Sequence, residues 1–252
     1  MVGNILENNM VTISGKVSTD LEFSHEVYGE GFYNFLLEVP RLSEYYDMIP
    51  VTVSERLIAG LDVAIGVYIE IEGQFRSYNN YNGPGNKLVL TVFAREVKRL
   101  EDKKFGKNPN QVYLNGFICK KPIYRTTPFG REIADILLAV NRAYNKSDYI
   151  PCICWGRNAR YTEEMTIGDN IKVWGRIQSR NYQKKLENGD VLNKTAYEVS
   201  VTKLDLVTKG EDGEEISNEE DTNSNELGSK KDIEEKTLTD VDNKSESENN
   251  ES

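Results

Sequence analysis

An internal repeat with a nearly constant spacing constrains this chain more than any other feature. Identical residues recur 101 positions apart along the first part of the repeat, so no gap is needed across that stretch, and the spacing then becomes 102. Repetition at a fixed spacing indicates a duplicated structural unit. We therefore expect two copies of one fold. The identical pairs include Gly15 and Gly116, Gly29 and Gly130, Arg41 and Arg142, Pro50 and Pro151, and Arg56 and Arg157, followed by Gly66 and Gly168 and by Gly73 and Gly175.

Each copy carries the alternation of apolar and polar residues that is typical of strands. A short helical or irregular stretch, 158–165, separates the third and fourth strands of the second copy. Five strands in this order form an OB-fold, a small Greek-key barrel. The fold class is therefore all-β, with two tandem five-stranded OB-fold barrels and a disordered acidic tail. The expected strands of the second copy are 112–118, 134–140, 149–155, 170–178 and 196–207, and those of the first are 11–17, 35–40, 48–53, 68–74 and 88–100.

The charge is distributed unevenly along the chain. The whole chain has a net charge of −10, but residues 1–108 carry −4, residues 109–208 carry +5 and the remainder carries −11. The sign of the charge that faces a partner therefore depends on the segment. The expected domains are a first, acidic OB-fold at 1–100, a linker at 101–109, a second, basic OB-fold at 110–208 and a tail at 209–252.

The tail contains no Phe, Tyr or Trp and only scattered aliphatic residues. Such a segment cannot bury enough apolar area to offset the entropy lost on ordering, so we expect it to be disordered. Two roles are open for it, a solubilising tail or an arm that recruits a partner.

Several classes of protein are excluded by what the sequence lacks. No apolar run is long enough to span a membrane, and no signal peptide is evident. The three cysteines are an odd and sparse count that fits a reducing compartment, so we expect a cytoplasmic protein. Cys152 and Cys154 are read as small apolar residues on one face of a strand, and with Cys119 they form no metal site and no disulfide framework. The only imidazole, His25, corresponds to Thr126 in the second copy, and no P-loop is present. We therefore predict no enzyme, no catalytic residues, no metal and no cofactor.

The second copy instead interleaves aromatic and cationic residues, as single-stranded nucleic acid binding requires. Cations contact the phosphates, and exposed rings stack on bases. We expect Tyr144 and Tyr182 to be exposed, while Trp155 could be exposed or buried. Trp174 could be a further stacking ring or an interdomain contact. The candidate binding residues are Arg142, Tyr144, Tyr149, Trp155, Arg157, Arg176, Arg180, Tyr182, Lys184 and Lys185.

The second copy resembles the bacterial single-stranded DNA-binding protein family over essentially all of residues 110–207. The resemblance implies an OB-fold that wraps single-stranded DNA, and Tyr144, Tyr149, Trp155 and Tyr182 fall where that family carries its stacking rings. The matching segments are NQVYLNG (110–116), Pro122, YRTTPFG (124–130), ILLAVNR (136–142), WG (155–156) and GDNIKVWGRIQSRNY (168–182).

The first copy resembles the family more faintly. Met48 and Ser54 occupy the places of Tyr149 and Trp155, so two of the four stacking positions have no ring there. Tyrosines lie near the other two positions, at Tyr45, Tyr46, Tyr78 and Tyr81.

The resemblance also sets expectations about partners. It implies a protein that acts in DNA replication, recombination or repair, and the family's tandem members make a homodimer an expectation here. The family's acidic arm usually ends in Pro-Phe, whereas this chain ends Asn249-Asn250-Glu251-Ser252, so docking of replication or repair proteins through the tip is not carried over. The alternative is a tandem OB-fold interaction module that binds a protein partner or RNA, because stacking and phosphate contacts do not require one particular sugar.

Overall fold

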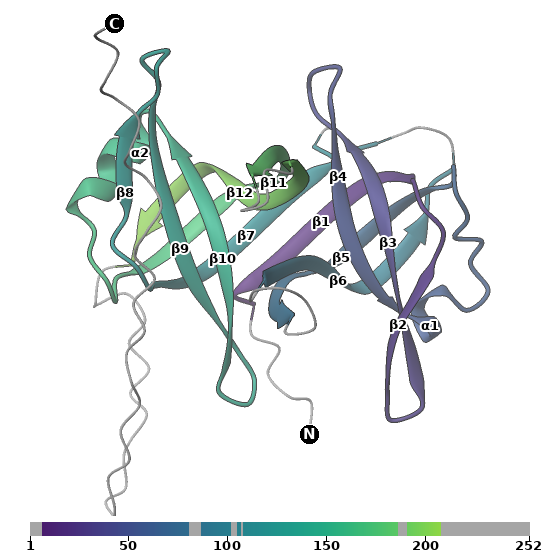
Figure 1. Ribbon diagram of the computed structural model, residues 1–252. Helices are drawn as coiled ribbons and strands as arrows, with labels where there is room; N and C mark the ends of the chain where they lie inside the picture. The colour runs from purple at the N-terminus through teal and green to yellow at the C-terminus, as the bar shows by residue number, and fades with distance from the viewer. Residues whose placement is uncertain (1–6, 81–86, 102–104, 107, 186–190, 208–252) are drawn as a thin grey trace, which may run out of the picture. The chain divides into compact units, whose positions relative to one another are not determined.

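The structure of the chain is a computed structural model that describes residues 7–80, 87–101, 105–106, 108–185 and 191–207 (Figure 1). Within that part of the chain, each half of the repeat contains six strands and a short α-helix. The first half comprises β1 (Asn9–Val17), β2 (Glu22–Val27), β3 (Glu30–Pro40), β4 (Tyr46–Ser54), α1 (Glu55–Ile58), β5 (Tyr68–Asn80) and β6 (Lys87–Arg99).

The second half repeats this order. Its helix is extended by one 3-10 turn, η1 (Thr162–Glu164), and its last two strands are longer than their counterparts. The elements are β7 (Asn110–Ile118), β8 (Ile123–Thr126), β9 (Glu132–Arg142), β10 (Lys146–Trp155), α2 (Arg157–Tyr161), β11 (Asn170–Lys185) and β12 (Val191–Leu206).

The expected fold class is confirmed, with one addition in each half. The sequence predicted five strands, and the structure adds β2 and β8, which pair antiparallel with β3 and β9. All six residues of β2 are exposed, so this strand buries no apolar face and lacks the alternation by which a strand is recognised in a sequence. Both added strands lie at the ends of the sheet order.

The same closure forms both barrels. In the first half, β1 pairs with β5 and β3, and β4 runs parallel to β6 at Val51 and Val92. In the second half, β7 pairs with β11 and β9, and β10 runs parallel to β12 at Cys152 and Val199. The four residues Val51, Val92, Cys152 and Val199 face the interiors of the two barrels. There, the burial of each Leu or Ile side chain contributes about 1.5–3 kcal/mol. Cys152 and Cys154 are buried free thiols, as the alternation predicted.

Two glycines mark bends in the second barrel. A register shift separates Trp174 from Gly175, at the same place as a shift between Glu72 and Gly73 in the first half. A Cβ atom on Gly116 would come within 2.5 Å of the Ala139 carbonyl oxygen, at the point where β7 reaches β9. Only glycine allows the backbones to approach so closely.

The two halves join through an antiparallel pair of their first strands, β1 and β7 (Figure 1). Val11 lies directly opposite Val112, its own counterpart in the repeat. The pairing is symmetric about this point, because Asn9 lies opposite Leu114 and its counterpart Asn110 lies opposite Ile13, as in the self-complementary interface of a twofold dimer. The side chain of Asn9 is hydrogen-bonded to the backbone of Phe75, and Asn110 is bonded to Ile177 in the same way. In the described part of the chain, no helix has the length and apolar character needed to cross a membrane.

Candidate nucleic-acid interface

The outward face of β10 presents two of the candidate rings. The residues Ile150, Cys152 and Cys154 point into the core, and Tyr149 and Trp155 share the opposite face because side chains alternate along a strand. Tyr149 is 46% exposed and Trp155 is 39% exposed. The open question about Trp155 is therefore resolved in favour of exposure.

A hydrogen bond orients the Trp155 ring. Its Nε1 atom donates to the Ser200 hydroxyl of β12, 3.2 Å away. The bond holds the edge of the indole against the neighbouring strand and leaves part of the ring in solvent. Ser200 was not predicted as part of the site, because nothing in the sequence relates it to Trp155, which lies 45 positions away.

The other two candidate rings lie on hairpins. Tyr144 occupies the β9–β10 turn, where it and Asn145 both have positive φ (62° and 53°), the geometry of a tight two-residue hairpin. Tyr144 is 93% exposed and Tyr182 of β11 is 39% exposed, as expected. Tyr182 lines a cavity of about 540 Å³ with Asn181 and Gln183 of β11 and with residues of β12.

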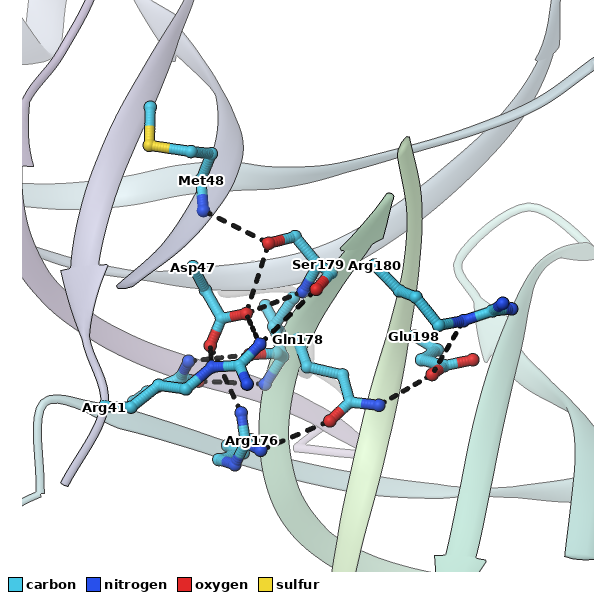
Figure 2. Close-up of polar contacts among 10 residues, drawn as sticks. Arg41, Asp47, Met48, Arg176, Gln178, Ser179, Arg180 and Glu198 are labelled. Atoms are coloured by element: carbon cyan, nitrogen blue, oxygen red, sulfur yellow. Dashed lines mark hydrogen bonds and ion pairs between the residues drawn. The ribbon is translucent and has the colours of Figure 1, made fainter. Parts of the chain in front are cut away.

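The candidate cations divide into two groups. Arg157, at the start of α2, and Arg180 of β11 are exposed. The Arg180 Nε atom lies 4.0 Å from Oε1 of Glu198, a carboxylate that also accepts a 2.6 Å hydrogen bond from Gln178 (Figure 2). Strand β11 continues through Lys184 and Lys185, whose side chains lie outside the described part of the structure.

Arg142 and Arg176 instead have carboxylate partners inside the protein. The Arg142 Nε atom lies 3.3 Å from Oδ2 of Asp148, and the Arg176 Nη1 atom lies 3.2 Å from Oδ2 of Asp47. Burial lowers the pKa of Arg176, although the nearby Asp47 acts in the opposite direction. The charge that these two arginines offer to a phosphate is therefore partly neutralised.

Asp47 anchors a cluster that spans the two halves (Figure 2). Arg41 donates two hydrogen bonds to its carboxylate, at 2.6 and 2.8 Å, and the backbone N–H of Ser179 in the other half donates a third at 2.7 Å. The backbone N–H of Met48 donates to the Ser179 hydroxyl at 3.3 Å. The buried carboxylate is thus satisfied by partners from both halves.

The counterpart of this cluster holds one of the candidate rings. The backbone N–H of Ser77, in the first half, donates to Oδ1 of Asp148 at 2.7 Å. The backbone N–H of Tyr149 in turn donates to the Ser77 hydroxyl, also at 2.7 Å. Burial raises the pKa of Asp148, against the effects of the Ser77 hydrogen bond and of the nearby arginines. The first half therefore fixes the backbone that carries Tyr149.

Asp47, Ser77, Asp148 and Ser179 are not among the residues predicted from the sequence. A signal was available for both pairs, because Asp47 and Asp148, and likewise Ser77 and Ser179, stand at equivalent positions of the repeat. A repeated serine suggests no chemistry by itself, and its role becomes visible only when the two halves are seen to contact one another.

On the equivalent face of the first half, the positions that correspond to Tyr149 and Trp155 carry no ring. Met48 is half-buried, and Ser54 is buried and accepts a hydrogen bond from the backbone of Arg56 at the start of α1. The nearby tyrosines Tyr45, Tyr46 and Tyr78 are exposed. Tyr81 lies outside the described residues.

Trp174 contacts residues of its own half. The centroid of its ring lies 5.2 Å from that of the Tyr113 ring. The ammonium group of Lys203, on β12, lies 4.3 Å from the centroid of the Trp174 ring. Its indole is therefore partly covered by a ring and a cation. Within the described residues, no group of His, Cys, Asp and Glu side chains is suited to hold a metal ion.

Comparison with known proteins identifies relatives of the second half. The sequence matches the single-strand binding protein family over residues 109–207. Single-stranded DNA-binding protein 1 of Staphylococcus aureus (strain COL) is 39% identical over 83 residues, which are 30% of this chain and 50% of that protein. Single-stranded DNA-binding protein B of Bacillus subtilis (strain 168) is 36% identical over 83 residues, 30% of this chain and 74% of that protein.

The likeness in fold extends over both halves. The crystal structure of the wild-type single-stranded DNA binding protein from Thermus aquaticus matches 80% of this chain and 94% of its own, with a TM-score of 0.64 and 20% identity. The sequence matches span about half the length of most of the relatives. Because the match to the Bacillus subtilis protein B covers most of that relative at 36% identity, the chain belongs to the single-strand binding protein family.

Proposed function

We propose that the chain binds single-stranded DNA on the outward face of its second half. The observation that carries this proposal is the exposure of Tyr144, Tyr149, Trp155 and Tyr182 in the half with a net charge of +5. Exposed rings beside cationic side chains are the combination that binds single-stranded nucleic acid. Each base that stacks on such a ring contributes about 1–3 kcal/mol to binding.

The face combines two kinds of contact. Arg157 and Arg180 are exposed and contact phosphates, and the sequence of β11 adds two further cations, Lys184 and Lys185. Arg142 and Arg176 contribute less, because Asp148 and Asp47 already hold them. Stacking does not distinguish strongly among bases, so the second half binds with little sequence preference.

The biological setting of this activity is single-stranded DNA that becomes exposed during replication, recombination or repair. The protein protects or organises that strand and carries out no chemistry on it, because the family is one of binding proteins and the chain is not an enzyme. A cytoplasmic location, a homodimer and partners for the tail stay predictions from the sequence.

The test is the affinity of the full chain for fluorescent oligo-dT, for duplex of the same length and for oligo-U, measured by anisotropy at several salt concentrations. We expect tight binding to oligo-dT, much weaker binding to duplex and a steep fall in affinity with salt, because bound phosphates release counterions. Equal affinity for duplex, or an affinity that does not depend on salt, would contradict the proposal. A preference for oligo-U would favour an RNA-binding protein instead.

A further inference from the structure

The first half has a hollow on the face that corresponds to the proposed binding face of the second half. Pro50 and Thr52 of β4, which line it, stand at the positions of Pro151 and Ile153 of β10, between the places of the two candidate rings. The hollow has a volume of about 240 Å³. At about 30 Å³ per water molecule, it has room for about eight groups of that size. This is enough for one long side chain.

In the second half, the same part of the face carries two arginines of the chain itself. Arg125 of β8 donates hydrogen bonds of 2.9 and 3.1 Å to the Asp135 carboxylate of β9. Asp135 lies directly opposite Ile153, in the middle of this face. The Arg180 side chain of β11 lies 4.0 Å from the Glu198 carboxylate of β12 (Figure 2). The fold thus accommodates guanidinium groups at this place when carboxylates stand beside them.

The first half has neither of these arginines. Ser24 and Tyr78 stand at the two arginine positions. Asn34 and Thr91 stand at the two carboxylate positions. A carboxylate is nevertheless present, because Glu22 of β2 lines the hollow, is exposed and forms no ion pair among the described residues. No described Lys, Arg or His lines the hollow, so the anionic group stands there without a cation.

The lining offers the contacts that an arginine side chain makes. Glu22 lies directly opposite Asn34 in the β2–β3 pair, and Asn34 lies opposite Thr52 in the β3–β4 pair, so the three polar side chains form one row. The Glu22 carboxylate accepts charge-assisted hydrogen bonds from a guanidinium group. The Tyr78 ring is 48% exposed and attracts a cation to its face. Apolar lining residues such as Leu36 cover the aliphatic part of the side chain.

The charge and the position of the hollow favour a protein segment over a nucleic acid. A nucleotide in the hollow would bring its phosphate close to Glu22, in a half with a net charge of −4. Strand β2, which carries Glu22, is at one end of the described sheet order, and an extended segment can add to such an edge. A segment along this edge can place one of its side chains in the hollow.

From these observations we propose that the first half docks an extended segment of a partner protein and takes up one arginine of that segment in the hollow, between Glu22 and Tyr78. The arginine of the partner stands where the second half uses an arginine of its own. This surface belongs to the first half, so the inference goes beyond the proposed binding of DNA by the second half.

The experiment is an NMR titration of the 15N-labelled full chain with N-acetyl-arginine amide and, separately, with N-acetyl-citrulline amide, in which an uncharged urea group replaces the guanidinium. We expect the arginine probe to shift the side-chain amide of Asn34 and the backbone amides of Glu22 and Thr52. Its affinity should be about five- to tenfold higher than that of the citrulline probe, because an exposed ion pair and a cation–π contact each contribute modestly. Glu22→Gln should bring this ratio close to one.

Two further variants complete the test. The matched control is Glu26→Gln, which removes the same charge from an exposed position of the same strand that does not line the hollow, and it should keep the wild-type ratio. The double variant Ser24→Arg with Asn34→Asp rebuilds the arginine–carboxylate pair of the second half. Its own arginine should compete with the arginine probe and weaken the binding of that probe about fivefold.

Equal affinities for the two probes, shifts confined to the second half, or the same ratio in Glu22→Gln and Glu26→Gln would overturn the inference. Shifts of the hollow with oligo-dT but not with the arginine probe would also overturn it, because the hollow would then belong to the path of the DNA. A failure of the proposed function would be seen separately, as a loss of oligo-dT binding in the anisotropy titration.

Discussion

At the scale of single residues, the alternation along β10 separates the candidate rings from the core. Cys152 and Cys154 are buried on one side of the strand, while Tyr149 and Trp155 are exposed on the other. The positions that correspond to these rings in the first half hold Met48 and Ser54. The same backbone therefore supports two different surfaces.

Substitution of the rings tests this difference. Trp155→Ala and Tyr182→Ala should each weaken binding to oligo-dT by about 1–3 kcal/mol, the contribution of one stacked base. Met48→Ala, on the equivalent strand of the first half, should change the affinity little. Ser54→Ala should also leave the affinity almost unchanged, but it removes the helix cap of α1 and should cost about 1 kcal/mol of stability. Anisotropy titrations and urea denaturation measure the two quantities. Equal losses of affinity from both halves would show that the first half stacks bases too.

The buried Asp148 predicts a pH dependence of stability. Burial raises its pKa in the folded protein. A carboxyl with a raised pKa holds its proton more tightly when folded. The stability that it contributes is therefore fully present below the unfolded-state pKa of about 3.9 and is lost as the pH rises through the folded-state value. The free energy of unfolding of the wild type minus that of Asp148→Asn should fall with pH above about 4. Urea denaturation of both proteins at a series of pH values checks this, and a difference that is flat or rises with pH would contradict it.

At the scale of elements, two symmetric contacts tie β4 to β11 and β10 to β5. In each contact an aspartate accepts the backbone N–H of a serine in the other half, at 2.7 Å. The residue that follows each aspartate donates its backbone N–H to the same serine. In one contact that residue is Met48 and in the other it is the candidate ring Tyr149.

Only one of the two contacts therefore holds a candidate ring. This difference predicts that Ser77, in the first half, affects binding by the second half. Ser77→Ala removes the hydroxyl that accepts the Tyr149 N–H and should weaken binding to oligo-dT a few-fold, since one hydrogen bond contributes about 0.5–1.5 kcal/mol. Ser179→Ala removes the matching hydroxyl on the other side and serves as the control, with a similar loss of stability and a smaller loss of affinity.

A double-mutant cycle tests whether Ser77 affects the binding of oligo-dT through Tyr149. If Ser77 acts by positioning Tyr149, Ser77→Ala should cost little further affinity in a Tyr149→Ala background. Ser77→Thr, which keeps the hydroxyl, should restore part of the affinity. Additive losses would assign Ser77 a purely structural role.

Much of the element order could be predicted from the sequence. Apolar alternation predicts each strand, and the repeat predicts the same strand again from its counterpart in the other half. The position of the helix after β10 and the buried cysteines follow from local pattern alone. The strands β2 and β8 could not be predicted, because an exposed edge strand carries no apolar periodicity. The carboxylate partners of Arg142 and Arg176 could not be assigned, because the sequence does not show which carboxylates fold against them.

At the scale of the whole molecule, the parts of the chain differ more in net charge than in topology. The two halves share one topology, yet residues 1–108 carry −4 and residues 109–208 carry +5. Residues 209–252 carry −11 and lie outside the described part of the structure, so the prediction that this segment is disordered stays a prediction. An acidic segment tethered to a basic face competes with phosphate for the same cations.

Deletion of residues 209–252 tests this competition. The truncated chain should fold as before, since the deleted segment contains no aromatic residue and few aliphatic ones. Its affinity for oligo-dT should be higher at low salt, and the gain should disappear as the Debye length falls below about 8 Å. Circular dichroism and anisotropy check the fold and the affinity. Weaker binding or loss of structure after truncation would show that the tail is a structural part of the protein.

The central claim, that bases stack on the exposed face of the second half, is tested most directly by the fluorescence of Trp155. The chain has two tryptophans, so Trp174→Phe leaves Trp155 as the sole indole, and Trp155→Phe leaves Trp174. Titration with oligo-dT should quench Trp155 strongly and to saturation, at the concentration where anisotropy reports binding, while Trp174, covered by Tyr113 and Lys203, should respond weakly. Saturated binding without quenching of Trp155 would contradict the account.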